Sequence, residues 1–254
     1  AAGLHVFVEK PLALDLAEAE AIAAAAHTAG RQVMVGHLIR YHDAFIAMQE
    51  QLANGVVGAV HHITANRLAM GRIRATESAI YDLCPHDLSL LLALMGGPPR
   101  QVSCHGASHV TPGLPDMVST WLGFPDGRSA MMTTGWMCPY KEHRLTVTGE
   151  RGSLVFDDTR PWAEKLTLYR DDIVPDGANF AIARTAPMHL PVPESEPLRQ
   201  EMRAFITCCE TGKAPPTDIA DGLAVQRVLQ AIDENFTEFG TTPDLPDITL
   251  ARKG

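Results

Sequence analysis

The sequence lacks the features that would place it in several specialised classes of protein. Its apolar stretches all end well before the roughly 20 residues that a membrane-spanning helix needs. No basic segment followed by an apolar one marks a secretory signal. Lys and Arg number 21 against 30 Asp and Glu, and they form no stripe that could bind a nucleic-acid backbone. With 46% hydrophobic residues and a net charge of −9, we expect a soluble globular protein with neither a membrane nor a nucleic acid as partner.

Cysteine is also scarce. The five cysteines form no CxxC pair, and their number is odd. This pattern favours free thiols over a disulfide framework, because disulfides belong to oxidising compartments and come in pairs. We therefore expect a cytoplasmic protein.

Familiar site motifs are absent. The sequence contains no GxSxG, no phosphate-binding P-loop and no GxGxxG. His61 and His62 are adjacent, so on a strand they would point to opposite faces. His105 and His109 could share a face, but no carboxylate at a suitable spacing completes a metal site. We predict no bound metal.

The first 36 residues have the pattern of a βαβ unit. Residues 5–8 and 33–36 are short apolar runs typical of buried strands. Between them, Asp15 stands three residues before Glu18 at a predicted helix start, and an Ala-rich helix ends at Gly30. Such a unit makes its two strands parallel, but two strands are too few for a stable sheet. We expect either further strands before residue 1 or a partner on this edge.

The rest of the chain predicts an α+β domain. Helices are expected over residues 42–53, 85–95, 197–211 and 218–239, with Pro85 at the favoured first helical position. Residues 59–68 and six segments between 101 and 170 have the pattern of strands, and short connections between the six imply antiparallel pairing. Residues 175–195 are rich in proline and predict a long surface loop.

Two sets of polar residues are candidates for a site. Lys10 follows the first strand at its carboxyl end, where ligands bind in open α/β sheets; a solvent-facing loop lysine is the alternative. Asp82 and His86 are four residues apart across the predicted helix start, so both could face one cavity. The helix dipole and a neighbouring carboxylate act on His86 in opposite directions, which predicts titration near neutral pH. The alternative is a capping aspartate and a buried, hydrogen-bonded histidine.

Further basic and aromatic residues could line the same crevice. Arg67 and Arg74 lie between a predicted strand and the Asp82 segment, where they would suit an anionic ligand, although a solvated loop is an equal alternative. His37, Arg40 and Tyr41 follow the second strand. Packing between the two parts of the chain is the alternative for these three.

Several segments together resemble the Gfo/Idh/MocA family of NAD(P)-dependent oxidoreductases. Residues 5–13, with Glu9-Lys10-Pro11, resemble the strand that ends in that family's EKP motif. Asp82 and His86 match its catalytic Asp/His spacing, and residues 149–152 match a Gly-x-x-Gly turn. Residues 81–89, YDLCPHDLS, resemble the branch of the family that acts on nucleotide sugars such as UDP-N-acetylhexosamines or their uronic acids.

The resemblance implies a division of the chain and roles for its residues. Residues 1–36 would be the C-terminal part of a dinucleotide-binding Rossmann domain. Residues 37–254 would be a substrate-binding and oligomerisation domain, with a mainly antiparallel open sheet covered by helices on one face. Lys10 would bind the reacting sugar hydroxyl beside NAD or NADP, His86 would take its proton and Asp82 would orient His86. The open sheet would build a dimer or tetramer.

One departure from the family is large. Its members begin with a Rossmann half carrying GxGxxG, so roughly 90 residues are expected to be missing here. The chain as given should then bind a dinucleotide poorly. A non-catalytic relative acting as a binding or oligomerisation module is the main alternative, and a metal-dependent lyase using Asp82 and His86 is a weaker one.

Overall fold

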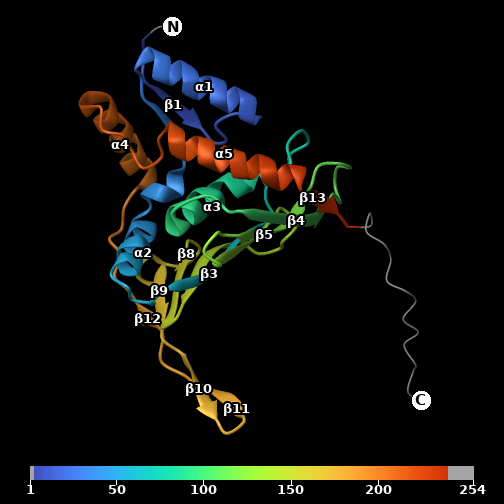
Figure 1. Cartoon of the computed structure of the whole chain (residues 1–254), viewed down its shortest axis with the longest axis vertical. Coiled ribbons are helices and arrows are strands. Elements are labelled where there is room, and N and C mark those ends of the chain that lie inside the picture. The colour runs from blue at the N-terminus through green and yellow to red at the C-terminus, as the bar shows by residue number, and fades with distance from the viewer. Residues whose placement is uncertain (1–2, 240–254) are drawn as a thin grey trace.

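The computed structural model describes residues 3–239. It consists of a large curved sheet with helices on one face and a small βα unit beyond those helices, at the end where the chain begins (Figure 1). None of the helices in the described residues is long and apolar enough to cross a membrane. The helices are, in chain order, α1 (Leu16–Ala29), η1 (Leu38–Tyr41), α2 (Asp43–Ala53), α3 (Ala79–Met95), η2 (Trp162–Glu164), α4 (Pro197–Thr211) and α5 (Ile219–Glu234).

The small unit has the predicted strand–helix–strand order. Strands β1 (Val6–Glu9) and β2 (Val33–Gly36) pair in parallel. The side chain of Asp15 caps α1 by accepting a 2.8 Å hydrogen bond from the Glu18 amide. Gly30 ends the helix with a φ of 60°, a left-handed conformation that glycine adopts without steric cost. The βαβ prediction is confirmed.

Helix α5, which lies about 200 residues later in the chain, supports this two-stranded sheet. The backbone N–H of Val35 donates to the carbonyl of Thr217, just before α5, at 2.9 Å. At Gly222 a Cβ atom would stand 2.5 Å from Val35 Cγ2, so only glycine allows the helix to approach β2 this closely. Helix α5 and the residue just before it therefore pack directly against β2.

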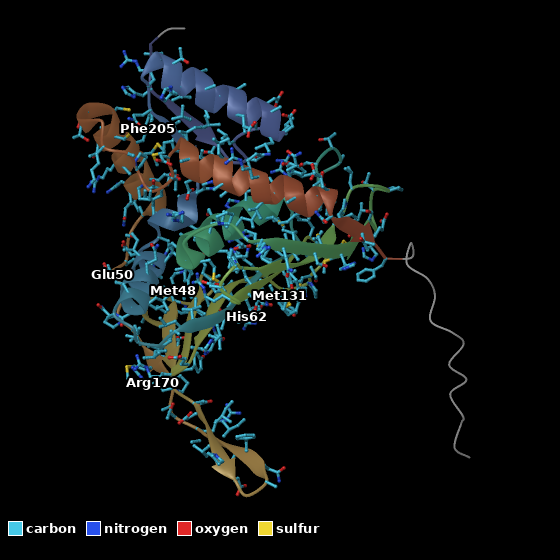
Figure 2. The ribbon with its side chains drawn as sticks, in the orientation of Figure 1. Met48, Glu50, His62, Met131, Arg170 and Phe205 are labelled. Atoms are coloured by element: carbon cyan, nitrogen blue, oxygen red, sulfur yellow. The ribbon has the colours of Figure 1, made fainter. Side chains whose placement is uncertain are left out.

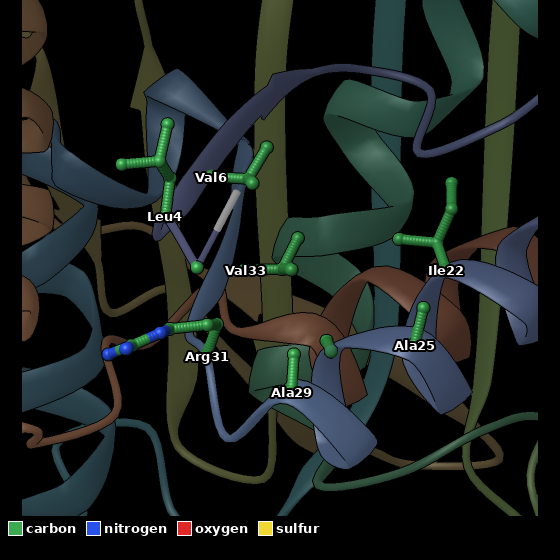
Figure 3. Close-up of a pocket in the computed structure, with 9 residues that line it drawn as sticks. Leu4, Val6, Ile22, Ala25, Ala29, Arg31 and Val33 are labelled. Atoms are coloured by element: carbon green, nitrogen blue, oxygen red, sulfur yellow. The ribbon is translucent and has the colours of Figure 1, made fainter. Parts of the chain in front are cut away.

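The outer edge of β1 has an apolar surface. Leu4 and Val6 are 69% and 44% exposed. Together with α1 they border a cavity of about 370 Å³, shown in Figure 3. The cavity is lined almost entirely by apolar side chains, among them Leu4, Val6, Ile22, Ala25, Ala29 and Val33. No other segment within residues 3–239 adds a strand to this edge.

The large sheet has nine strands within the described residues and is mixed. Six of its eight pairings are antiparallel, whereas β3–β6 and β4–β13 are parallel, so the expectation of a mainly antiparallel sheet is confirmed in part. The strands are, in spatial order, β12 (Met188–His189), β9 (Leu166–Tyr169), β8 (Gly152–Asp157), β7 (Glu142–Gly149), β3 (Val60–Leu68), β6 (Ser129–Gly135), β5 (Met117–Gly123), β4 (Gln101–Ala107) and β13 (Phe236–Glu238).

Alternation along the strands separates a buried face from an open one. In β5, Val118 and Leu122 are buried, whereas Trp121 on the other face is 51% exposed. By the same two-residue period, His62 on β3 and Met131 on β6 lie on the open face (Figure 2). The main hydrophobic core therefore fills the space between the sheet and the helices α2, α3 and α5.

The predicted start of α3 is wrong. The helix begins at Ala79 after Ser78, and Pro85 lies inside it. Proline has no N–H to donate to the carbonyl four residues earlier, which is why sequence rules place it at a helix start. Here Ile80, Cys84 and Leu88 are fully buried against the core, and this packing outweighs the lost hydrogen bond.

Two other predictions near the C-terminus also need correction. Part of the predicted loop 175–195 is structured: β10 (Asp172–Asp176) and β11 (Asn179–Ala183) form a projecting hairpin, and β12 pairs with β9. Pro175 is compatible with β10 because β10 pairs on one side only. The proline content of the segment therefore led to the wrong prediction of a loop. The last helix ends at Glu234 rather than Phe239, because β13 follows it and adds to β4.

Candidate active site

The loop after β1 reaches the first turn of α3. The Lys10 ammonium group donates to the backbone carbonyl oxygen of Asp82 and lies 3.5 Å from its Oδ1. The Lys10 side chain is only 16% exposed. Lys10 is therefore turned into the molecule, and the alternative of a solvent-facing loop lysine does not hold.

The Asp82 carboxylate interacts with donor groups from three segments of the chain. Besides Lys10, its carboxylate accepts from Arg74 Nη2 at 3.0 Å and from Trp136 Nε1 at 3.2 Å. Burial alone would raise the pKa of Asp82, but the hydrogen bond from Arg74 and the charge of Lys10 lower it overall. Within residues 3–239, no side-chain hydrogen bond joins Asp82 to His86. The ionised Asp82 carboxylate therefore contacts Lys10 and not the His86 side chain. The implied role of Asp82 in orienting His86 stays a prediction.

His86 lies one helical turn after Asp82, on the same side of α3. Its Nδ1 atom is buried and has no hydrogen-bond partner within the described residues. Burial, followed by the charges of Arg67 and Lys10, holds the pKa of His86 well below its usual value. The expected titration near neutral pH is therefore wrong: His86 is not at the helix start, and the nearby charges are positive. At pH 7 the ring is neutral and able to accept a proton.

Arg67, predicted to bind substrate, is largely occupied by another residue of the chain. Its guanidinium forms a two-pronged ion pair with Asp87, with both contacts at 2.9 Å and both residues buried. His143 Nδ1 lies 3.5 Å from Arg67 Nη1, and burial followed by the Arg67 charge lowers the pKa of His143 to about 4. Arg67 therefore ties β3 to α3 beneath the site.

A cavity of about 120 Å³ opens beside Asp82. Charged side chains, apolar side chains and the aromatic Trp136 share its wall. Sequence reasoning did not select Trp136 or His143, because each stands in strand-like surroundings without a motif of its own. The lining residues are Arg67, Leu68, Ala69, Gly71, Arg72, Asp82, Leu83, Gly135, Trp136 and His143.

The segment after β2 contains three residues that the sequence offered for substrate binding, His37, Arg40 and Tyr41. Arg40 Nη1 donates to Asp221 Oδ1 at 2.8 Å and to the Ser89 carbonyl at 3.1 Å, so it links η1, α5 and α3. The Tyr41 hydroxyl lies 2.9 Å from the Thr217 hydroxyl and is buried. These contacts favour packing over substrate binding for Arg40 and Tyr41. His37 is also buried, at 1% exposure, but both its ring nitrogens lack partners within residues 3–239.

Glu9 and Pro11 flank Lys10. Glu9 is exposed at the end of β1, and a Cβ atom at Gly36, on β2, would stand 3.0 Å from its carboxylate. On α4, Glu201 is almost completely buried, and burial followed by the charge of Glu9 raises its pKa to about 7. Figure 2 shows Phe205 of the same helix near β1, where its ring packs against Phe7 with centroids 5.7 Å apart.

Comparison with known proteins agrees with this geometry. Residues 45–155 match the family model described as the GFO/IDH/MocA C-terminal domain. Residues 1–37 match the model described as an oxidoreductase family with an NAD-binding Rossmann fold. The chain belongs to the Gfo/Idh/MocA family. The resemblance drawn from the EKP segment and the Asp82/His86 spacing is therefore confirmed.

Individual proteins extend the comparison. UDP-N-acetylglucosamine 3-dehydrogenase of Acidithiobacillus ferrooxidans is 35% identical over 58% of this chain and 45% of its own length. An oxidoreductase crystal structure from Magnetospirillum magnetotacticum is 32% identical, with a TM-score of 0.77 over 90% of this chain and 72% of that one. An Azotobacter vinelandii inositol dehydrogenase homologue complexed with NADH and myo-inositol is 18% identical and shares the fold, with a TM-score of 0.73 over 92% and 69% of the two chains. The match thus spans less than half of the first of these relatives.

Proposed function

We propose that the complete protein oxidises a hydroxyl group of a sugar, carried on a nucleotide, with NAD or NADP as hydride acceptor. The observation that carries the proposal is the Lys10–Asp82 contact with a neutral His86 one turn along α3. This places a cation and a proton acceptor on one side of the helix. Oxidation of an alcohol needs both, because the hydroxyl proton must leave and the developing negative charge on oxygen must be stabilised.

The described residues fit the nicotinamide end of a dinucleotide. Lys10, flanked by Glu9 and Pro11, stands at the carboxyl ends of β1 and β2, where α/β sheets bind such cofactors. His37 follows β2 and has ring nitrogens free to pair with a polar ligand. When bound, the cofactor supplies a hydride acceptor. The uncovered edge of β1 is where a further strand of a Rossmann sheet would add.

Residues of this chain bind the substrate hydroxyl group and accept its proton. Lys10 donates to the substrate oxygen and stabilises it as it becomes an alkoxide. Asp82, itself ionised, holds the Lys10 ammonium group in place. His86 accepts the hydroxyl proton at a ring nitrogen, which its low pKa leaves unprotonated at pH 7.

The cavity beside Asp82 supports a sugar substrate with an anionic part. Trp136 offers an aromatic face, and Arg72 adds a guanidinium group at the cavity wall. Arg67, which lines this wall, and Arg74, which is not among its lining residues, are engaged with Asp87 and Asp82, so neither is left free to bind an anion. The relative from A. ferrooxidans bears the name of a nucleotide-sugar dehydrogenase, which supports the same substrate class.

We propose two further properties of the complete protein. The open sheet face, with Trp121 half exposed, would form a homodimer or homotetramer. Five free cysteines would suit a reducing compartment such as the cytoplasm.

The deciding experiment uses the gene's full reading frame. NAD and NADP reduction would be followed with UDP-N-acetylhexosamines, their uronic acids, free hexosamines and inositols. The proposal predicts turnover with a nucleotide sugar, and loss of turnover in His86→Ala with dinucleotide binding nearly intact. Cofactor binding without turnover on any of these substrates would favour the alternative, a non-catalytic oligomerisation module. Consumption of a substrate without NAD or NADP reduction, abolished by a chelator, would favour a metal-dependent lyase.

A further inference from the structure

Each nitrogen of the Arg67 guanidinium group faces a neighbouring side chain. Nε and Nη2 each lie 2.9 Å from one oxygen of Asp87, which fixes the plane of the group. The remaining nitrogen, Nη1, lies 3.5 Å from Nδ1 of His143. Arg67 and His143 are directly opposite each other on the antiparallel strands β3 and β7, so their side chains leave the sheet on the same face. The register of the sheet therefore brings these two side chains together.

This face of the sheet is the one that packs against the helices. On β7, Leu145 and Val147 are buried in the main core, and His143 precedes them at the same two-residue spacing. His143 also lines the cavity beside Asp82. The imidazole ring thus stands where the apolar row of β7 reaches the candidate site.

The contact with Arg67 determines which nitrogen of His143 carries the proton. A guanidinium group has only N–H donors, so Nδ1 can face it only with its lone pair. Burial, followed by the charge of Arg67, lowers the pKa of His143 to about 4, which leaves the ring neutral at pH 7. A neutral imidazole has one N–H group, and with Nδ1 as acceptor that group is at Nε2. Within residues 3–239, no hydrogen bond uses Nε2 of His143.

The other side chains around the cavity leave donors unpaired rather than acceptors. Arg72 lines the cavity, and its guanidinium group has no ion pair within the part of the chain that the structure describes. The carboxylate of Asp82 is already paired with Lys10 and Arg74. Arginine and the Nε2–H group of His143 can only donate hydrogen bonds. A ligand group that accepts hydrogen bonds and donates none is therefore the best complement to this wall.

We propose that His143 is a substrate-binding residue whose Nε2–H group donates a hydrogen bond to an acceptor-only oxygen of the sugar, either the carbonyl of an acetamido group or a carboxylate. Arg67 is then a positioning residue that sets the tautomer of His143. The inference rests on the proposed function and names a residue that selects among its substrates. Complete ligand sites usually measure roughly 300–1,000 Å³, so a cavity of about 120 Å³ holds only one part of a nucleotide sugar.

The first test needs no turnover. Full-length protein labelled with ¹⁵N at histidine is studied by NMR at pH 7, which shows which ring nitrogen carries the proton, and the signals missing from His143→Gln identify those of His143. We expect the Nε2–H tautomer in the wild type. The double variant Arg67→Met/Asp87→Leu removes both charges of the pair and should show a larger share of the Nδ1–H tautomer. An Nδ1–H tautomer in the wild type would overturn the proposal, and an unchanged Nε2–H tautomer in the double variant would overturn the role of Arg67.

The second test compares four ligands of the full-length protein: UDP-N-acetylglucosamine, its uronic acid, UDP-glucuronic acid and UDP-glucose. His143→Leu removes the donor, whereas His143→Gln keeps an N–H group on a side chain of similar length. For ligands that carry the selected group, we expect His143→Leu to weaken binding and to lower kcat/KM by about tenfold to a hundredfold, because it leaves a buried acceptor unpaired. His143→Gln should recover part of this loss. UDP-glucose, which has neither an acetamido group nor a carboxylate, should be little affected.

The pattern of losses identifies the oxygen. A loss confined to the two N-acetylated sugars indicates the acetamido carbonyl, and a loss confined to the two uronic acids indicates the carboxylate. An equal loss for all four ligands would overturn the inference, because the contact would then be to a group that they share. His61→Leu, at the exposed start of β3, is the matched control and should behave as wild type.

These outcomes separate the inference from the proposed function. If the wild type binds the sugars but turns none over, the proposed function is refuted, and the dissociation constants still decide the role of His143. If the wild type turns a sugar over and His143→Leu changes neither Kd nor kcat/KM, the proposed function stands and the inference is overturned. Binding of none of the four ligands would overturn both.

Discussion

Arg67 on β3 and Asp87 on α3 form a buried two-pronged ion pair directly beneath the candidate site. Nε and Nη2 of the arginine each lie 2.9 Å from one oxygen of the aspartate, and both side chains are less than a tenth exposed. Such a pair is geometrically specific, but its formation removes two charges from water. The main effect of the Arg67–Asp87 pair is therefore to fix the position of α3. Asp82 and His86, which lie on this helix, are positioned with it.

Removing one partner of this pair should destabilise the protein strongly. We expect Arg67→Met to lower the free energy of unfolding by about 3–5 kcal/mol, because Asp87 would remain as an unpaired buried charge. The double variant Arg67→Met/Asp87→Leu should recover most of that loss. Urea unfolding of the wild type, both single variants and the double variant measures the coupling. Additive losses would show that the two side chains do not depend on each other.

Lys10 should be essential for turnover and unimportant for folding. Lys10→Met keeps the length of the side chain but removes the charge that would stabilise the alkoxide, so we expect kcat of the full-length protein to fall by at least about a thousandfold. The melting temperature should change little, since Lys10 is a loop residue whose hydrogen bonds, within the part of the chain that the structure describes, all go to Asp82. A rate close to that of the wild type would remove Lys10 from the site.

Glu201 should make stability depend on pH between about 4.5 and 7. Its pKa rises from 4.5 to about 7 in the folded state, so folding favours the protonated form. The sign follows from linkage: this stabilisation is complete below pH 4.5 and is lost as the pH rises through 7. Glu201→Gln should therefore match the wild type at pH 4 and be more stable at pH 8, by up to roughly 3 kcal/mol.

The matched control for Glu201 is Glu9→Gln. Glu9 is exposed and provides the second cause of the shift, so its removal should lower the pKa of Glu201 only in part. Urea unfolding at pH 4, 6 and 8 measures all three proteins. If Glu201→Gln and the wild type show the same pH profile, the carboxyl group is not held in the protonated form.

Gly222 should tolerate no larger residue. Gly222→Ala would place a methyl group 2.5 Å from Val35 Cγ2, and such overpacking typically costs about 1–3 kcal/mol even though alanine favours helix. Adding Val35→Ala should restore stability, because it removes the opposing methyl groups. Hydrogen exchange should show the single variant loosening β1 and β2 more than the large sheet. Uniform loosening would argue against a local clash.

The sequence predicted most of this fold where local pattern and tertiary packing agree. Asp15 and Gly30 delimit α1 because capping chemistry is local, and the alternation of Val118, Leu122 and Trp121 marks β5 because the sheet has one buried face. The start of α3 was missed because the burial of Ile80 and Cys84 outweighs the local effect of Pro85.

The sequence offered candidate site residues but not their contact partners. The EKP segment and the Asp/His spacing selected Lys10, Asp82 and His86 as candidates, and the structure brings Lys10 to Asp82. No sequence pattern predicts that Asp82 accepts a hydrogen bond from Trp136, 54 residues later. Nor does any pattern predict that Arg40 donates a hydrogen bond to Asp221, 181 residues away. Those contacts arise from tertiary packing. They pair the Asp82 carboxylate with Lys10 and place the Arg40 guanidinium against Asp221 on α5.

The hairpin of β10 and β11 stands apart from the large sheet, with Gly177 and Ala178 exposed at its tip. A projecting tip of small residues is the kind of place where added sequence is best tolerated. A fluorescent reporter or an affinity handle inserted between these two residues would lie far along the chain from Lys10, Asp82 and His86. The hairpin therefore offers a labelling position from which binding at the site can be followed without altering the groups that perform it.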